Sequence, residues 1–164
     1  MAPLQPQITQ LDSIPGVALT AARDMLAEIG TDMHRFGDAA RFASWAGVCP
    51  GNNESGGKRR RGKTRQGNRS LRRLLGQCAW GARKTPTCLG QTFRRLEVRI
   101  GKKKAALAVA HNMLVIVSHL LAQGTCYEEA RYDYRSAKQE VRERKRAIKA
   151  LERLGYTVTL GQAA

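Results

Sequence analysis

The chain has 164 residues, of which 42% are hydrophobic, so it is long enough to bury one core as a single domain with a tail. Lysine and arginine outnumber aspartate and glutamate by 29 to 13, which gives a formal net charge of +16. This charge favours a polyanionic partner. It lies in loops and helix ends rather than along one amphipathic helix, so nucleic acid is expected and a membrane surface is not.

The N-terminal residues predict a short flexible segment over 1–10, followed by two helices. The first sixteen residues lack the basic and apolar regions of a signal peptide. Over Leu11 to Gly30, a tight turn at Pro15 and Gly16 precedes apolar residues that recur on one helical face: Leu19, Ala22, Leu26 and Ile29. This pattern resembles a helix-hairpin-helix, in which main-chain amides, here around Gly16, contact a DNA phosphate. A plain helical turn inside a bundle explains the spacing equally well.

The next segment predicts a short helix that begins at Asp38, whose side chain can cap it after the break at Gly37. Phe36, Phe42 and Trp45 are expected in the core. An aromatic ring beside a basic loop could alternatively stack on an unpaired base.

Residues 52–70 form the most unusual stretch, a basic and glycine-rich loop. From Lys58 in this loop to Arg73 just beyond it, the chain has nine Lys/Arg residues and no acid. Glycines let the main chain approach a ligand closely, and guanidinium groups match phosphate oxygens. The loop enters a helix near Asn68, where free N–H groups add to the positive field. Asn68 is expected to cap this helix, Ser70 to serve the same structural purpose, and Gly67 to supply the turn. The candidate nucleic-acid-binding residues are Gly16, Lys58, Arg59, Arg60, Arg61, Lys63, Arg65, Arg69, Arg72 and Arg73.

Helices also dominate the rest of the chain, so the predicted fold is mainly α, a helical bundle with the basic loop and a short extended C-terminal segment. Leu71 to Ala82 follow a helical spacing, with a polar face that carries Arg69, Arg72, Arg73 and Arg83. A second helix follows over 89–100, and a nearly all-apolar central helix over 103–123 belongs inside the bundle, not in a membrane. Residues 128–164 are expected to form a charged helical tail with a short terminal strand.

The cysteines point to free intracellular thiols, because Cys49, Cys78, Cys88 and Cys126 are far apart and form no CxxC pair. No metal ligand set is predicted. A zinc site that also uses His34, His111 or His119 is the weaker alternative.

Four motifs in order carry a resemblance to a known family: IPGVALTAARDMLAEIG, RFASWAGVCPGNNESGG, GKTRQGNRSLRRLLGQCAW and HNMLVIVSHLLAQGTCY. Together they resemble the C-terminal domain of insertion-sequence transposases of family one-hundred-and-ten, also called one-hundred-and-sixteen, which are related to the pilin-gene invertases. The resemblance covers 11–127.

The resemblance implies a DNA recombinase of the bacterial cytoplasm, associated with the nucleoid. In the family, an N-terminal RuvC-like domain holds Mg²⁺ through four acidic residues, and a serine of the C-terminal domain attacks DNA. The matching serine here is Ser55, followed by Gly56. No acidic quartet precedes residue 11, so this chain is expected to bind no cofactor and to be incomplete, and inactive or nearly so without an acidic domain acting in trans. A structured guide RNA and a homo-oligomer on DNA are further implied partners.

The residue types suit this chemistry, because guanidinium groups near Ser55 would stabilise the charge that develops on a phosphate under attack. The base that would take the serine proton is not identified. Two alternatives remain open: a non-catalytic basic module that binds DNA or RNA, and a decayed remnant that folds poorly.

Overall fold

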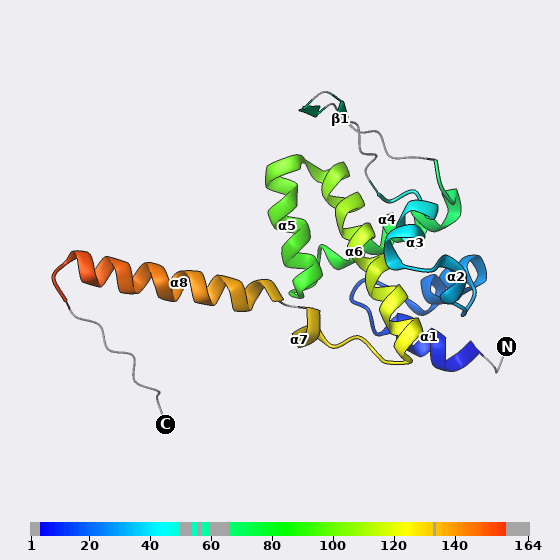
Figure 1. Ribbon diagram of the computed structural model, residues 1–164. Coiled ribbons are helices and arrows are strands. Elements are labelled where there is room, and N and C mark those ends of the chain that lie inside the picture. Colours follow the sequence, from blue (N-terminus) through cyan, green and yellow to red (C-terminus); the bar gives the residue numbers. More distant parts are fainter. Residues whose placement is uncertain (1–3, 50–53, 56, 60–65, 133, 157–164) are drawn as a thin grey trace. The chain divides into compact units, whose positions relative to one another are not determined.

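The structure is a computed structural model that describes residues 4–49, 54–55, 57–59, 66–132 and 134–156. The chain divides into two compact units, 1–127 and 128–164 (Figure 1). The fold is mainly helical, as predicted. In the first unit the elements are α1 (Gln5–Asp12), α2 (Leu19–Ile29), the 3-10 helix η2 (His34–Phe36), α3 (Ala39–Trp45), β1 (Glu54–Ser55), β2 (Lys58–Arg59), α4 (Arg69–Ala82), α5 (Cys88–Ile100) and α6 (Lys102–Gln123).

The first unit is built around α6, which packs against α1, α3, α4 and α5 (Figure 1). Its buried residues lie along the whole helix: Ala105, Ala106, Val109, Ala110, Met113, Leu114, Ile116, Val117 and Leu120. Within the described part of the chain, α6 is the one helix long and apolar enough to cross a membrane. Half of that apolar stretch is already buried inside the protein, as expected for a core helix.

The expectation of a flexible segment over 1–10 is wrong from Gln5 onward, because α1 begins there. Ile8 and Leu11 lie one helical turn apart and are both buried. Their burial against the neighbouring helices stabilises this short helix in a segment that was expected to be flexible.

The turn between α1 and α2 packs closely against the end of α4. Gly16 has a φ of +89°, and a Cβ atom on it would collide with the backbone of Cys78 and Ala82. Glycine is therefore required here twice, for the left-handed backbone and for the close approach of the two segments. This packing explains Gly16 without a DNA phosphate, so its predicted phosphate contact stays a prediction.

The second unit contains α7 (Glu129–Tyr132) and α8 (Tyr134–Arg153). The long charged helix was expected, and its apolar residues Val141 and Leu151 are exposed. The predicted terminal strand falls mostly on residues 157–164, outside the described residues.

Candidate nucleic-acid interface

Two segments meet at the base of the predicted basic loop. The main-chain N–H of Asn68 donates a hydrogen bond of 3.2 Å to the carbonyl oxygen of Trp45. Beside it, a Cβ atom on Gly67 would collide with the backbone of Trp45, Ala46 and Gly47. We call these five residues the loop base. They bring together the two points at which the chain leaves and re-enters the helical bundle.

Asn68 caps α4, as the sequence predicted. Its Oδ1 accepts a hydrogen bond of 2.9 Å from the N–H of Leu71, and its Nδ2 donates one of 2.7 Å to Glu28 Oε2 on α2. Ser70 lies inside the first turn of α4 and is exposed, so the capping role expected of it belongs to Asn68 alone.

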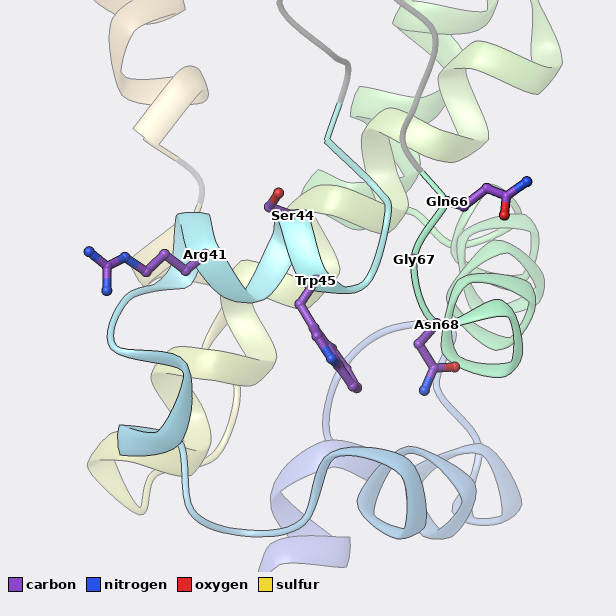
Figure 2. A pocket seen from close by; sticks show the side chains of 6 residues that line it. All are labelled: Arg41, Ser44, Trp45, Gln66, Gly67 and Asn68. Carbon is purple, nitrogen blue, oxygen red and sulfur yellow. The ribbon is translucent and has the colours of Figure 1, made fainter.

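An open cavity of about 670 Å³ borders the loop base (Figure 2). Its lining residues are Arg41, Ser44, Trp45, Gln66, Gly67 and Asn68. Trp45 packs against Phe36 and Phe42, with ring centroids 5.1 and 6.2 Å away, yet 37% of its surface remains exposed. Phe42 is a core residue as predicted, while Trp45 has one side in the aromatic cluster and one side on the cavity.

The predicted nucleophile lies in a two-stranded hairpin within the loop. β1 and β2 pair antiparallel, with Ser55 opposite Lys58, and Gly57 in the turn has a φ of +73°. Lys58 is exposed. The other predicted loop residues, Gly56, Arg60, Arg61, Lys63 and Arg65, and the side chains of Ser55 and Arg59, lie outside what the structure describes.

The exposed side of α4 carries three of the basic residues predicted to bind nucleic acid. Their side chains surround a second open cavity of about 670 Å³, here called the α4 groove, which is lined by Arg69, Arg72, Arg73, Gly76, Gln77 and Trp80. The predicted Arg69, Arg72 and Arg73 are thus brought together. Trp80, which is 42% exposed, was not predicted as a site residue. It follows Arg69, Arg73 and Gly76 at helical spacing, and that spacing was the signal available in the sequence.

Two further arginines, Arg83 and Arg94, form hydrogen bonds within the protein. Arg83 was expected to extend that surface, but its Nε and Nη2 donate to Glu97 Oε2 and Oε1 at 2.7 and 3.2 Å. This contact lowers the pKa of Glu97 and raises that of Arg83. Arg94 donates to the carbonyl oxygens of Arg83 and Thr85 at 2.7 and 3.0 Å, where α4 ends.

The weaker zinc alternative gains no support from the described residues, among which no group of three or more His, Cys, Asp or Glu residues gathers. Cys49 Sγ does lie 3.7 Å from His111 Nδ1. Burial raises the pKa of the Cys49 thiol and lowers that of the His111 imidazole, so both side chains are held in their neutral forms.

Comparison with known proteins shows the family to which the chain belongs. The profile of the Transposase IS116/IS110/IS902 family matches residues 8–92, which run from within α1 to the start of α5 and include the loop base and the hairpin. Three curated relatives are similar to the chain. A putative transposase y4qE of Sinorhizobium fredii is 34% identical over 55% of this chain and 23% of its own length.

The insertion element IS110 uncharacterized 43.6 kDa protein of Streptomyces coelicolor is 32% identical over 77% of this chain and 31% of its own length. A probable family 20 transposase of Pseudomonas aeruginosa is 30% identical over 74% of this chain and 37% of its own length. The chain thus matches between 23% and 37% of the length of these curated relatives. Because the family profile covers more than half of the chain, the protein belongs to the IS116/IS110/IS902 family of transposases.

Proposed function

We propose that this chain is the DNA-handling part of a transposase, in which the loop that carries Ser55 cuts and rejoins DNA through a covalent serine link. The observation that supports the proposal is the hydrogen bond between Asn68 and Trp45, which brings the two ends of the loop together. In the sequence, the segment between them is basic and rich in glycine, and it leads into α4, whose arginines line the α4 groove. Both lie within the part matched by the transposase profile. A phosphate backbone is the ligand that such a charge distribution attracts.

The proposed reaction is a transesterification. The Ser55 oxygen forms a bond to phosphorus while the bond from phosphorus to the sugar oxygen of the departing strand breaks, and that oxygen takes up a proton. The serine proton leaves to a base that is still to be identified. Negative charge grows on the phosphate oxygens as the bond forms, and the basic residues of the loop would stabilise that charge. The phosphoserine link conserves the bond energy, so the reverse attack by a strand end rejoins the DNA without ATP.

The resemblance also implies Mg²⁺ held by acidic residues. Among the described residues the acids do not gather into a group that fits a cation. Asp24 and Glu28 are the two acids of α2 beside α4, and Glu28 already accepts the hydrogen bond from Asn68. We therefore assign no metal-dependent step to this chain and propose that an acidic, RuvC-like domain supplies the metal. A homo-oligomer on DNA and a structured guide RNA are part of the same proposal.

The test is a search for covalent protein–DNA adducts on a denaturing gel. The substrate is nicked DNA from the element's junction, so that the departing strand diffuses away. Wild-type chain, Ser55→Ala and Ser70→Ala are compared with and without Mg²⁺ and a separately supplied acidic domain. We expect an adduct that is lost in Ser55→Ala and kept in Ser70→Ala, because Ser70 lies in α4 outside the loop.

Undiminished adduct from Ser55→Ala would overturn the proposed nucleophile. If wild type binds DNA but forms no adduct under any of these conditions, the second candidate function holds instead. That candidate is a non-catalytic DNA- or RNA-binding module, and the observation that favours it is the α4 groove, which requires no serine.

A further inference from the structure

We propose that the α4 groove binds an unpaired stretch of a polynucleotide strand, with one base stacked on the indole of Trp80 and the backbone phosphates held by Arg69, Arg72 and Arg73. This inference depends on the proposed function only in taking nucleic acid as the partner. It does not depend on Ser55, because the groove lies along α4 and includes no residue of the loop hairpin.

Trp80 is an exposed ring held in place from within the protein. Its ring centroid lies 5.2 Å from that of Phe93, at an interplanar angle of 53°, and Phe93 is completely buried. The guanidinium carbon of Arg83 lies 6.0 Å from the Trp80 centroid, and Arg83 is itself fixed by two hydrogen bonds to Glu97. The indole is therefore preorganised, although Trp80 is 42% exposed and lines the groove. Burial alone does not explain why so large a ring stands here.

The charge of the groove complements a strand that passes over this ring. Arg69, Arg72 and Arg73 are its only charged lining residues within the described part of the chain. Among the described residues, no hydrogen bond or ion pair engages the side chain of any of the three. From Arg69 to Trp80 the helix rises by about 16 Å, a length on the scale of a few nucleotides of extended strand. Between them Gly76 presents no side chain, and nothing lies within 4 Å of the position its Cβ would take. That gap leaves room for a backbone.

Two acids lie on the α2 side of this surface. A smaller cavity of about 340 Å³ between α2 and α4 is lined by Arg73 together with Asp24 and Glu28. The phosphates are thus expected on the side of α4 that faces away from these acids.

The combination of stacking and charge selects an unpaired strand. In a duplex the faces of the bases are covered by their neighbours, so a ring in an open groove reaches only backbone and groove edges. In a single strand each base has a free face, and stacking on an aromatic side chain tolerates any sequence. A duplex could still contact the arginines, but it would gain nothing from Trp80.

The decisive measurement uses tryptophan fluorescence, because the chain contains two tryptophans. In the full chain carrying Trp45→Phe, Trp80 is the sole indole. We expect short oligothymidylate to quench its emission, and a blunt duplex bound at the same saturation to leave it nearly unchanged. An oligouridylate arm identifies the source of the strand. Quenching by either oligonucleotide supports strand binding in the α4 groove. The oligonucleotide that binds more tightly, DNA or RNA, identifies the strand that the groove binds.

Substitutions then separate stacking from folding. Trp80→Leu should weaken binding of oligothymidylate roughly 5- to 150-fold, the range for one stacked base, and leave duplex affinity within about twofold. Trp80→Phe should restore most of the loss, and Arg95→Gln on α5 is the matched charge control, since Arg95 lies outside the groove. Circular dichroism melting of each variant checks that the fold is retained.

Unchanged Trp80 emission at saturating oligonucleotide, or an equal loss of single-strand and duplex affinity in Trp80→Leu, would overturn the inference. Its failure is distinct from failure of the proposed function. Ser55→Ala should leave the quenching intact, whether or not an adduct forms in the wild type.

Discussion

The side-chain amide of Asn68 donates a 2.7 Å hydrogen bond to Glu28, so the residue that closes the loop base is also tied to α2. Through its Oδ1 the same side chain caps α4, and through its main-chain N–H it contacts Trp45. One residue therefore joins the loop, the arginine-bearing helix and the N-terminal helix pair.

Replacing Asn68 separates these contacts. Asn68→Ala should lower the free energy of unfolding by about 0.5–2 kcal/mol, because the cap is lost. Asn68→Asp keeps an oxygen for the cap but places a carboxylate against Glu28, so its stability should recover as pH falls. Urea denaturation of both variants across pH measures the effect, with Asp38→Ala, which removes the cap of α3, as control. An Asn68→Asp profile parallel to wild type would show that the contact with Glu28 is unimportant.

Gly67 and Gly76 form a matched pair for testing the loop base. In Gly67→Ala the new methyl group would collide with the backbone of Gly47. We therefore expect overpacking to lower the free energy of unfolding by about 1–3 kcal/mol. In Gly76→Ala the methyl group points into open space. Because alanine favours a helix interior more than glycine does, the free energy of unfolding should rise by about 0.5–1 kcal/mol. Thermal melting of the two variants gives the comparison. Equal changes in both would mean that the close approach at Gly67 does not form in solution.

The sequence predicted the helices well because their apolar residues recur at helical spacing. Leu71, Leu75, Cys78, Ala79 and Ala82 are all buried, and the expected central helix is α6. Leu19 followed the same pattern on α2, yet it is 41% exposed. Periodicity identifies the face of a helix, but how far the covering elements extend depends on contacts between distant segments.

The candidate site was harder to predict, for the same reason. The arginines of α4 could be identified because Arg69, Arg72 and Arg73 lie close together in the sequence, on the polar face of a predicted helix. The contact between Gly67 and Gly47 joins residues twenty positions apart, and the pairing of Arg83 with Glu97 joins two helices. Neither leaves a local pattern in the sequence. Arg83 therefore looked like part of the basic surface when it is neutralised by a carboxylate.

The Arg83–Glu97 pair predicts a particular pH dependence of stability. The guanidinium of Arg83 holds the pKa of Glu97 below its ordinary value of 4.5. The stabilisation is therefore fully present above about pH 4.5 and is lost as the pH falls through the lowered pKa of the folded state. Melting temperatures of wild type and Glu97→Gln should differ at neutral pH and converge in acid. A difference that stays constant between about pH 7 and pH 3 would show that the pair acts through packing rather than charge.

Cysteine reactivity should follow burial. Burial raises the pKa of the Cys78 thiol to about 11, whereas Cys126 is exposed. Near pH 8 only about one Cys78 side chain in a thousand is then a thiolate, and that fraction is also covered by the core. Iodoacetamide should label Cys126 first and Cys78 only after unfolding, as read by peptide mass spectrometry. Rapid labelling of Cys78 in the native protein would show that α4 separates readily from α6.

The arginines predict how nucleic-acid binding responds to salt. Arg72→Gln should reduce the slope of log affinity against log salt by about one, because one phosphate contact and its released counterions are lost. Arg94→Gln is the matched control, since Arg94 donates to the carbonyl oxygens at the end of α4. Arg94→Gln should lower the free energy of unfolding and leave the slope of log affinity against log salt nearly unchanged. Fluorescence anisotropy over a salt series measures both variants. If Arg94→Gln changed the slope as much as Arg72→Gln, binding would follow net charge alone, and the α4 groove would hold no defined phosphate.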